Sequence, residues 1–365
     1  MQKPQEQGSG GNTATYADDA DVVPLEVAFQ GSQQPSWNEL LFTYAQPRLA
    51  RSLQDLATSV LPYLALSVAM YFALRVSVLI TLALAVPAAG FLIRTFIVFH
   101  DCTHGSMFRS RRANAWLGAV LGLFVFAPFN RWRHDHKVHH ATSGDLDRRG
   151  VGDVPTLTVA EYRAKTPRER RAYRLFRHPA VMFGLGPIIA MMVGPRIASR
   201  SQRPRMRNSV LGTDLALLLV ISGLCVWIGI GNFLVIWFPA SLLAGSGGIW
   251  LFYVQHQFED AYWQSAEQWT YADAALRGAS YLKLPAVLQF FSGNIGLHHV
   301  HHLNARIPNY NLQRAHDENA VFHNVPTLSL RDGLRAVRLK LWDEGSGRLV
   351  SFREAAALPV SAPAA

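Results

Sequence analysis

The fold class is decided by one stretch, Val76-Ser-Val-Leu-Ile-Thr-Leu-Ala-Leu-Ala-Val-Pro-Ala-Ala-Gly-Phe-Leu-Ile93, which is soon followed by His100-Asp-Cys-Thr-His104. An apolar run of about 20 residues is long enough to cross a bilayer as a helix. Histidines at positions i and i+4 lie on the same face of a helix. The stretch therefore predicts a membrane helix that carries two metal-binding side chains near its end.

The apolar residues of the whole chain gather in blocks of this kind. The chain has 365 residues, of which 50% are hydrophobic and 16% are charged. Arg-rich stretches separate the apolar blocks, a pattern typical of an integral membrane protein. The blocks are Leu56–Leu74, Val76–Ile93, Ala113–Phe129, Ala180–Val193, Leu215–Ile230 and Phe233–Val254.

The connections between the blocks predict two transmembrane hairpins. Little more than Arg75 separates the first two blocks, and the turn dipeptide Gly231-Asn232 separates the last two. The two middle blocks are shorter. If the histidine clusters meet at one site, the middle blocks cannot span, because a span would move successive clusters to opposite sides. We therefore expect an all-α integral membrane fold with four spans and a cytoplasmic helical cap that holds a two-metal site.

Charge gives the expected orientation and argues against other classes of protein. The formal net charge is +10, and the basic residues lie beside apolar blocks, which favours a membrane over nucleic acid as partner. The positive-inside rule predicts cytoplasmic termini and a cytoplasmic active site. The two cysteines form no CxxC pair, which argues against a disulfide scaffold. We expect a polar N-terminal tail (1–46), one membrane domain (47–340) and a C-terminal tail (341–365).

Most of the 14 histidines fall in four short clusters. Spacings of i, i+3 and i+4 place the imidazoles of each cluster on one helix face, where we expect them to converge on one point. Imidazole is a good ligand for iron, zinc and copper, and nine imidazoles suit two metals better than one four-coordinate zinc ion. The candidate ligands are His100, His104, His136, His139, His140, His256, His298, His301 and His302.

Two histidines inside the clusters are expected not to ligate. His134 lies two residues before His136, and His299 lies one residue after His298, so neither shares the face of its neighbour on an ideal helix. A lone histidine in a membrane protein is more often a core or interfacial residue, and we interpret His178, His316 and His323 in this way.

At the clusters the sequence resembles the membrane fatty acid desaturases, in their bacterial acyl-lipid branch. HDCTH and two HxxHH boxes occur in the order of that family. The segments from His139 to Asp153, from Phe252 to Asp260 and from Gly296 to Tyr310 strengthen the resemblance, which covers residues 47–340. It implies that two iron ions bound by the nine histidines use O2 and two electrons to desaturate a fatty acyl lipid. It also implies an external, ferredoxin-like electron donor.

Asp101, Asp147 and Asn294 are candidates for the groups that support the metal ligands. Carboxylates often fix the tautomer of a ligating histidine, and Asp101 and Asp147 lie within or beside the clusters. Some animal relatives hold a water ligand with an Asn four residues before the equivalent of His256, but Phe252 stands there in this chain. Asn294 is the alternative candidate for a tenth ligand.

Two other functions remain open from the sequence. A related histidine-box hydroxylase would share the ligands but would insert oxygen into its substrate. The Asn-Tyr-x-Glu-His-Tyr segment typical of such alkane hydroxylases is absent. A metal transporter would need ionisable residues along a path through the membrane, whereas the histidines here lie at or beyond the ends of the apolar blocks.

Overall fold

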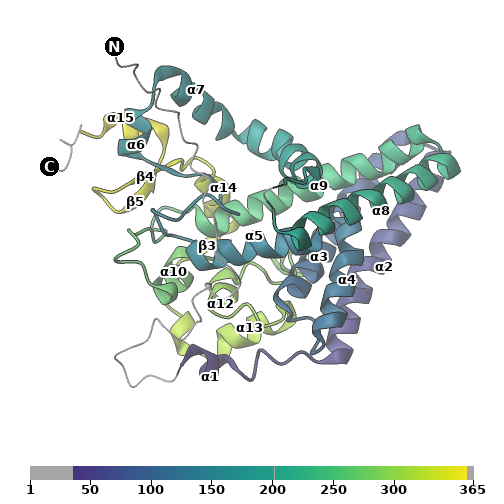
Figure 1. Cartoon of the computed structure of the whole chain (residues 1–365), viewed down its shortest axis with the longest axis horizontal. Helices are drawn as coiled ribbons and strands as arrows, with labels where there is room; N and C mark the ends of the chain where they lie inside the picture. Colours follow the sequence, from purple (N-terminus) through teal and green to yellow (C-terminus); the bar gives the residue numbers. More distant parts are fainter. Residues whose placement is uncertain (1–35, 201, 360–365) are drawn as a thin grey trace, which may run out of the picture. The chain divides into compact units, whose positions relative to one another are not determined.

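The computed structural model describes residues 36–200 and 202–359 and is mostly helical (Figure 1). Within these residues, four helices are long and apolar enough to cross a membrane. Figure 1 shows them on its right-hand side, with the shorter helices and strands of the cap on the left. The predicted all-α membrane fold with four candidate spans is thereby confirmed. The spans are α2 (Leu49–Ala73), α3 (Val78–His104), α8 (Pro204–Ile228) and α9 (Ile230–His256).

The four spans form the two expected hairpins, with turns set by local chemistry. Ser77 begins α3, because its hydroxyl oxygen accepts a hydrogen bond from the backbone N–H of Leu79 (3.2 Å). The second hairpin turns at Gly229, whose φ of +85° suits glycine, and α9 starts at the next residue. The prediction of a turn at Gly231-Asn232 was therefore wrong by two residues, because a helix can run through both.

Small side chains hold the spans together. Ala85, Ala88 and Ala89 of α3 and Ala240 and Ala244 of α9 are buried in one apolar cluster that also contains residues of α2. Without large side chains between them, the helix backbones approach closely and gain van der Waals contact. This packing fixes the ends of α3 and α9, which carry histidines, relative to each other.

The two middle apolar blocks form bent segments. α4 (Arg111–Phe124) and α5 (Phe129–Thr142) meet at 99° around Phe126, whose φ is +56°, and Pro128, which precedes α5. α7 (Pro167–Phe176) and the segment Val181–Arg196 meet at 58°. Counting each bent pair as one broken span would raise the number of candidate spans among the described residues to six. That neither pair spans remains a prediction.

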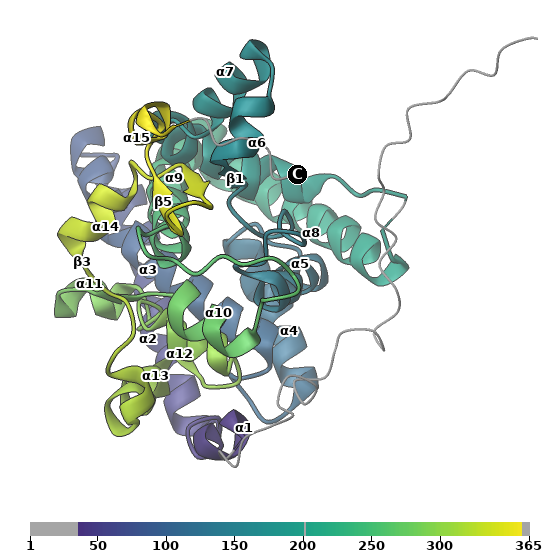
Figure 2. The same cartoon turned by 90° about the vertical axis from the view of Figure 1, so that its left-hand side faces the viewer.

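The cap consists of short helices and two small sheets (Figure 2). One sheet has the order β1-β4-β5 and the other pairs β2 with β3 in parallel. These strands are the addition to the expected all-α architecture. The remaining elements are α1 (Trp37–Leu41), α6 (Val159–Ala164), η1 (Val181–Leu185), η2 (Pro187–Val193), η3 (Gly194–Arg196), α10 (Tyr271–Gly278), α11 (Ala286–Phe291), α12 (His298–Leu303), α13 (Asn309–Glu318), η4 (Ala320–Phe322), α14 (Leu330–Ala336), α15 (Phe352–Ala357), β1 (Leu157–Thr158), β2 (Tyr281–Lys283), β3 (Thr327–Ser329), β4 (Leu341–Asp343) and β5 (Arg348–Val350).

The expected boundaries of the membrane domain remain predictions. Most of the expected N-terminal tail lies outside the described residues, and so do the last six residues of the chain. Next to the first boundary, Leu41 of α1 and Tyr44 are buried against α12 and α13. Beyond residue 340, β4 pairs with β1, and β5 pairs with β4.

Candidate metal centre

Four helix segments bring the nine candidate ligands together. α3 ends with His100 and His104, α9 ends with His256, and α5 and α12 each carry one HxxHH box. Their ring nitrogens form two groups, and within each group all ligand atoms lie within 4.8 Å of one another. The first group is His100, His104, His136, His140 and His301, and the second is His139, His256, His298 and His302.

Each HxxHH box contributes to both groups. In α5, His136 and His140 belong to the first group and His139 to the second; in α12, His298 and His302 belong to the second group and His301 to the first. On an ideal helix the i+4 residue lies about 40° to one side of residue i, and the i+3 residue about 60° to the other side. The expectation that each cluster converges on one point was therefore wrong, because the same spacing divides the box between two neighbouring points.

The nitrogens within a group face one another at short range. The Nε2 atom of His136 lies 2.9 Å from that of His100 and 3.1 Å from that of His140. In the second group, Nε2 of His298 lies 2.9 Å from that of His256 and 3.1 Å from that of His302. Nε2 of His104 and of His139 is buried without any hydrogen-bond partner.

Burial disfavours the charged form of five candidate ligands in α5 and α12. It lowers the pKa of His136, His140 and His298 well below the ordinary value of 6.5, and the neighbouring imidazoles lower it further. The pKa values of His301 and His302 are lowered for the same reasons. Neutral imidazole is the form that binds a metal, because only the neutral ring has a nitrogen lone pair to donate.

Hydrogen bonds to the opposite ring nitrogen turn Nε2 of two ligands inward. Nδ1 of His139 is hydrogen-bonded to the carboxylate of Asp153. Nδ1 of His256 donates to the backbone oxygen of Gly278 at 3.3 Å and lies 3.3 Å from the hydroxyl of Ser143. A proton on Nδ1 leaves the lone pair on Nε2, so these contacts select the tautomer that ligates through the converging nitrogens.

Asp153 was missed in the sequence, and the glycine directly before it is what places it. Gly152 has a φ of +72°, and a Cβ there would meet the backbone oxygen of Asp135 at 2.9 Å and Cβ of His139 at 3.0 Å. Only glycine lets the loop come this close to α5, and the next residue is then placed against the His139 ring. The same Gly-Asp pair occurs at Gly144-Asp145, also shortly after the box, so the pattern alone does not distinguish Asp153.

The donor set of these two groups fits metal binding. Several buried lone pairs that point at one another repel unless a cation lies between them. The Nε2 separations of 2.9–3.1 Å bring the donors of each group close enough to share one ion. The first group offers five donors and the second offers four.

Comparison with known proteins places the chain in a family. The family model described as "Fatty acid desaturase" matches residues 75–329. The chain is 44% identical over 331 residues to a Bacillus subtilis protein named "Fatty acid desaturase", covering 91% of this chain and 94% of that protein. The chain belongs to the fatty acid desaturase family. It is thus an enzyme of an oxygen-dependent class of oxidoreductases and an integral membrane protein.

More distant relatives of this desaturase cover a smaller part of the chain. A Synechocystis protein named "sn-1 oleoyl-lipid 12-desaturase" is 26% identical, over 62% of this chain and 64% of that protein. Another from the same organism, "sn-1 acyl-lipid omega-3 desaturase (ferredoxin)", is 27% identical over 60% of this chain and 62% of that protein. Both relatives are named as desaturases of acyl chains in lipids, which agrees with the family expected from the histidine boxes.

The three candidate supporting residues lie in different places in the desaturase. Oδ1 of Asp101 is 3.6 Å from Nδ1 of His100, and its Oδ2 accepts hydrogen bonds from Asn309. Asp147 accepts a hydrogen bond from the backbone N–H of Ala266 (2.8 Å), and Asn294 donates to the backbone oxygen of Asn309 (3.2 Å). These contacts of Asp147 and Asn294 are not to candidate ligands. Of the three residues, only Asp101 contacts a candidate ligand.

The two histidines expected to be spare lie outside both groups. His299 is buried, and its Nε2 lies 3.0 Å from Nδ1 of His316 on α13, away from the other histidines of its own box. His134 is in neither group.

Phe252 stands at the position where some animal relatives were expected to have an Asn. Its ring packs against the rings of His139 and His256, with centroids 5.0 and 5.3 Å away. An apolar ring therefore closes this side of the second group.

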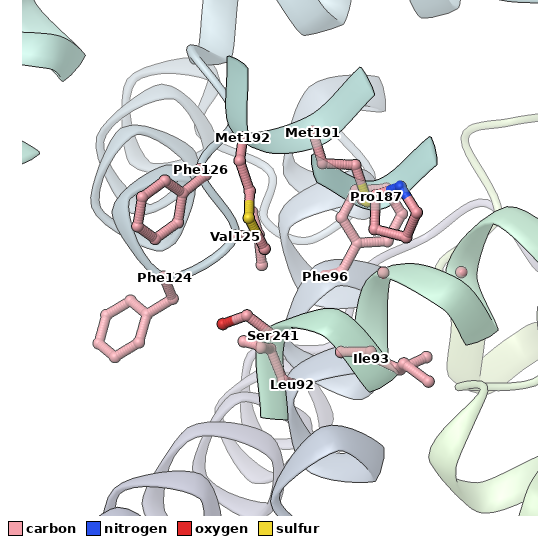
Figure 3. Close-up of a pocket in the computed structure, with 13 residues that line it drawn as sticks. Leu92, Ile93, Phe96, Phe124, Val125, Phe126, Pro187, Met191, Met192 and Ser241 are labelled. Carbon is pink, nitrogen blue, oxygen red and sulfur yellow. The ribbon is translucent and has the colours of Figure 1, made fainter. Parts of the chain in front are cut away.

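An apolar cavity lies close to the first group (Figure 3). In Figure 3, Met191, Met192 and Pro187 of η2 lie above it, and Leu92 and Ser241 lie below it. The ring of Phe96 also lines the cavity, and its centroid lies 6.5 Å from that of His100. Trp132 lies 5.5 Å from Phe96 and stacks on His136 at 4.3 Å. One layer of aromatic rings therefore separates the cavity from the candidate ligands.

Proposed function

We propose that the protein is an acyl-lipid desaturase that binds two iron ions through the nine histidines and uses O2. The convergence of nine buried imidazoles in two groups carries this proposal. In desaturation, –CH2–CH2– and O2, with two electrons and two protons, give –CH=CH– and two water molecules. Iron would supply the oxidising chemistry with O2, because side chains are too weak as oxidants to attack an unactivated methylene.

The chain's own residues prepare the site for this chemistry. Asp153 and the backbone oxygen of Gly278 hold His139 and His256 in the ligating tautomer. The rings of Phe96 and Trp132 exclude water from the side that faces the apolar cavity. Exclusion of water prevents side reactions of a reactive centre.

We infer that the cavity of Figure 3 accommodates part of the acyl chain. Its lining is apolar except for Ser241, and its walls come from α3, α9, η2 and the bend after α4. Since α3 and α9 are spans, a lipid tail can reach the cavity from the bilayer. A chain in this position would end at Phe96, next to the first histidine group.

The electron donor in this proposal is a small acidic protein of the ferredoxin type. The net charge of +10 favours an acidic partner, because opposite charges speed encounter. One relative carries ferredoxin in its name. We expect purified enzyme to be driven by reduced ferredoxin, with a rate that falls as salt screens the attraction.

Gas chromatography of fatty acid methyl esters tests the activity. A host that expresses the chain should gain unsaturated acyl chains, and a host that expresses His301→Gln at the same level should not. Hydroxylated chains would instead indicate the related hydroxylase. Changed cellular metal content without any new lipid would favour the transporter.

Elemental analysis tests the metal. Protein from iron-replete cells should hold two iron ions per chain, and its activity should follow the iron content. A fully active preparation with one metal ion per chain would contradict the two-metal site.

We also propose that both termini and the histidine groups face the cytoplasm of a bacterial inner membrane. A cysteine introduced at Arg133, beside the second box, should be shielded from an impermeant maleimide added from the periplasm. A cysteine at Gly231, in the turn region of the second hairpin, should react. Labelling at 133 but not at 231 would reverse the proposed orientation.

A further inference from the structure

α7 is an unusual helix for the surface of a folded domain, because none of its residues is buried. Four of its ten residues are arginines, and it ends in Leu175 and Phe176, which are 64% and 44% exposed. A helix with a basic face and exposed apolar residues is typical of a membrane–water interface. The composition of α7 therefore points to lipid as its neighbour.

The chain that follows α7 lies against a membrane span. The hydroxyl of Ser246 in α9 donates to the backbone oxygen of Phe183 in η1 at 2.5 Å. Ser246 lies ten residues before His256 in α9, which is about 15 Å along the helix axis. η1 is thus packed well inside the span, and Leu185 at its end and Ile189 of η2 are exposed. α7 ends at Phe176, five residues before η1 begins, so the C-terminal end of α7 lies near the level where lipid headgroups begin.

Beside α7 is a cleft with a basic lining. It has a volume of about 200 Å³ and lies between α6, α7 and α15, which are adjacent in both Figure 1 and Figure 2. Three guanidinium groups line it together with two aromatic rings and small apolar side chains. The lining residues are Val159, Tyr162, Arg163, Arg170, Arg174, Phe352, Ala355 and Ala356.

The three arginines have different local roles. Arg163 donates to the backbone oxygens of Ala355 and Leu358 at 2.8 and 2.6 Å and so caps the end of α15. Nε of Arg174 donates to the hydroxyl of Tyr162 at 2.6 Å, and its guanidinium lies over the ring of Phe352. Arg170 is half-buried, and its guanidinium has no hydrogen-bond or ion-pair partner within the described part of the chain.

Among the residues that the structure describes, 36–200 and 202–359, no carboxylate lines the cleft to balance these charges. The acids nearby in the chain are engaged elsewhere: Glu161 pairs with Arg149, Glu169 with Thr166, and Glu354 with Ser351. Guanidinium groups recognise phosphate by paired hydrogen bonds. The cleft therefore has a fixed excess of positive charge and donors suited to a phosphate group.

We propose that this cleft binds the phosphate of an anionic phospholipid from the surrounding bilayer. Arg170 and the free nitrogens of Arg174 are the phosphate donors, and Leu175 and Phe176 contact the lipid's acyl region. An acidic protein would also suit the charge, but the exposed apolar end of α7 and its link to η1 favour lipid. The site is separate from the histidine groups and does not depend on the iron or desaturase proposal.

Native mass spectrometry of the full chain in detergent tests the site. The probes are added phosphatidylglycerol and, as the uncharged control, phosphatidylcholine. Wild-type protein should retain phosphatidylglycerol preferentially. Arg170→Gln should weaken retention roughly tenfold or more, because a hydrogen bond to a charged group is lost. Arg171→Gln removes the same charge from the same helix but lies outside the cleft, and it should change retention less than about twofold.

Three outcomes would overturn the proposal. Equal losses in Arg170→Gln and Arg171→Gln would show diffuse attraction without a site. Displacement of the lipid by millimolar inorganic phosphate would identify a site for the free anion. Unchanged lipid retention with a raised KM for ferredoxin in Arg170→Gln would assign the cleft to the electron donor. Equal thermal stability of the two variants in detergent confirms that both are folded.

Discussion

Asp153→Asn should remove one metal ion and leave the other. Asp153 contacts one candidate ligand, His139, which belongs to the second histidine group. Both side chains are nearly inaccessible, with exposures of 9% and 1%. The asparagine keeps the size of the aspartate but removes its charge, so the ring of His139 loses its charge-assisted hydrogen bond and its fixed tautomer.

The size of the effect follows from that single contact. A hydrogen bond to a charged group contributes about 1.5–3 kcal/mol, and about 1.4 kcal/mol corresponds to a tenfold change in affinity. The second group should therefore bind its metal about 10- to 100-fold more weakly, which agrees with the effect of removing supporting groups elsewhere. The first group has no hydrogen bond to Asp153 and should keep its ion.

The assay is metal content after equilibration with increasing chelator. The metal content of the wild-type protein should drop from two ions per chain over a single range of chelator concentration. Asp153→Asn should lose one of its ions at a chelator concentration about 10- to 100-fold lower. Asp147→Asn is the matched control, because Asp147 holds the backbone of Ala266 and no histidine. Equal metal loss in both variants, or two tightly held ions in Asp153→Asn, would refute the reasoning.

Three further predictions concern the ligands, the acyl cavity and a buried lysine. His298→Gln should abolish activity and lower metal content, whereas His299→Gln should remain active with both ions; the reverse pattern at matched expression would disprove the assignment of the last box. Gly245→Leu should lower activity on the native acyl chains roughly tenfold or more with iron retained, because a Cβ at Gly245 already meets Pro187 at 2.7 Å in the cavity wall. Gly223→Leu, in open space on α8, should be active, and equal activity of the two would exclude this cavity. Burial is the main cause, and the nearby Arg177 the second, that lowers the pKa of Lys340 from 10.5 to about 7. The folded protein therefore binds fewer protons than the unfolded chain between about pH 7 and 10.5. The free energy of unfolding consequently rises with pH across this window. Lys340→Met should lack this contribution, so the Tm of the wild type relative to the variant should rise from pH 7 to 9.5; a constant difference would contradict the lowered pKa.

The membrane fold and the candidate ligands could be predicted from the sequence because both depend on short-range patterns. The length of an apolar block indicates a span without knowledge of its neighbours. In the same way, the spacing of His298, His301 and His302 follows from the helix period. His299 was set apart by the same reasoning, and the structure places it against His316 on α13.

Only the tertiary structure decided how the histidines are shared and what supports them. The helix period separates the i+3 histidine of each HxxHH box from the i and i+4 pair, but it does not tell which histidines of other helices join each part. That is decided by how α3, α5, α9 and α12 approach one another. Asp147 and Asp153 look alike in the sequence, since both are acids soon after the second box. The sharp approach of the loop at Gly152 brings Asp153 to His139, and Asp147 is held at Ala266. A contact of this kind depends on the path of the backbone through space, which local sequence does not determine.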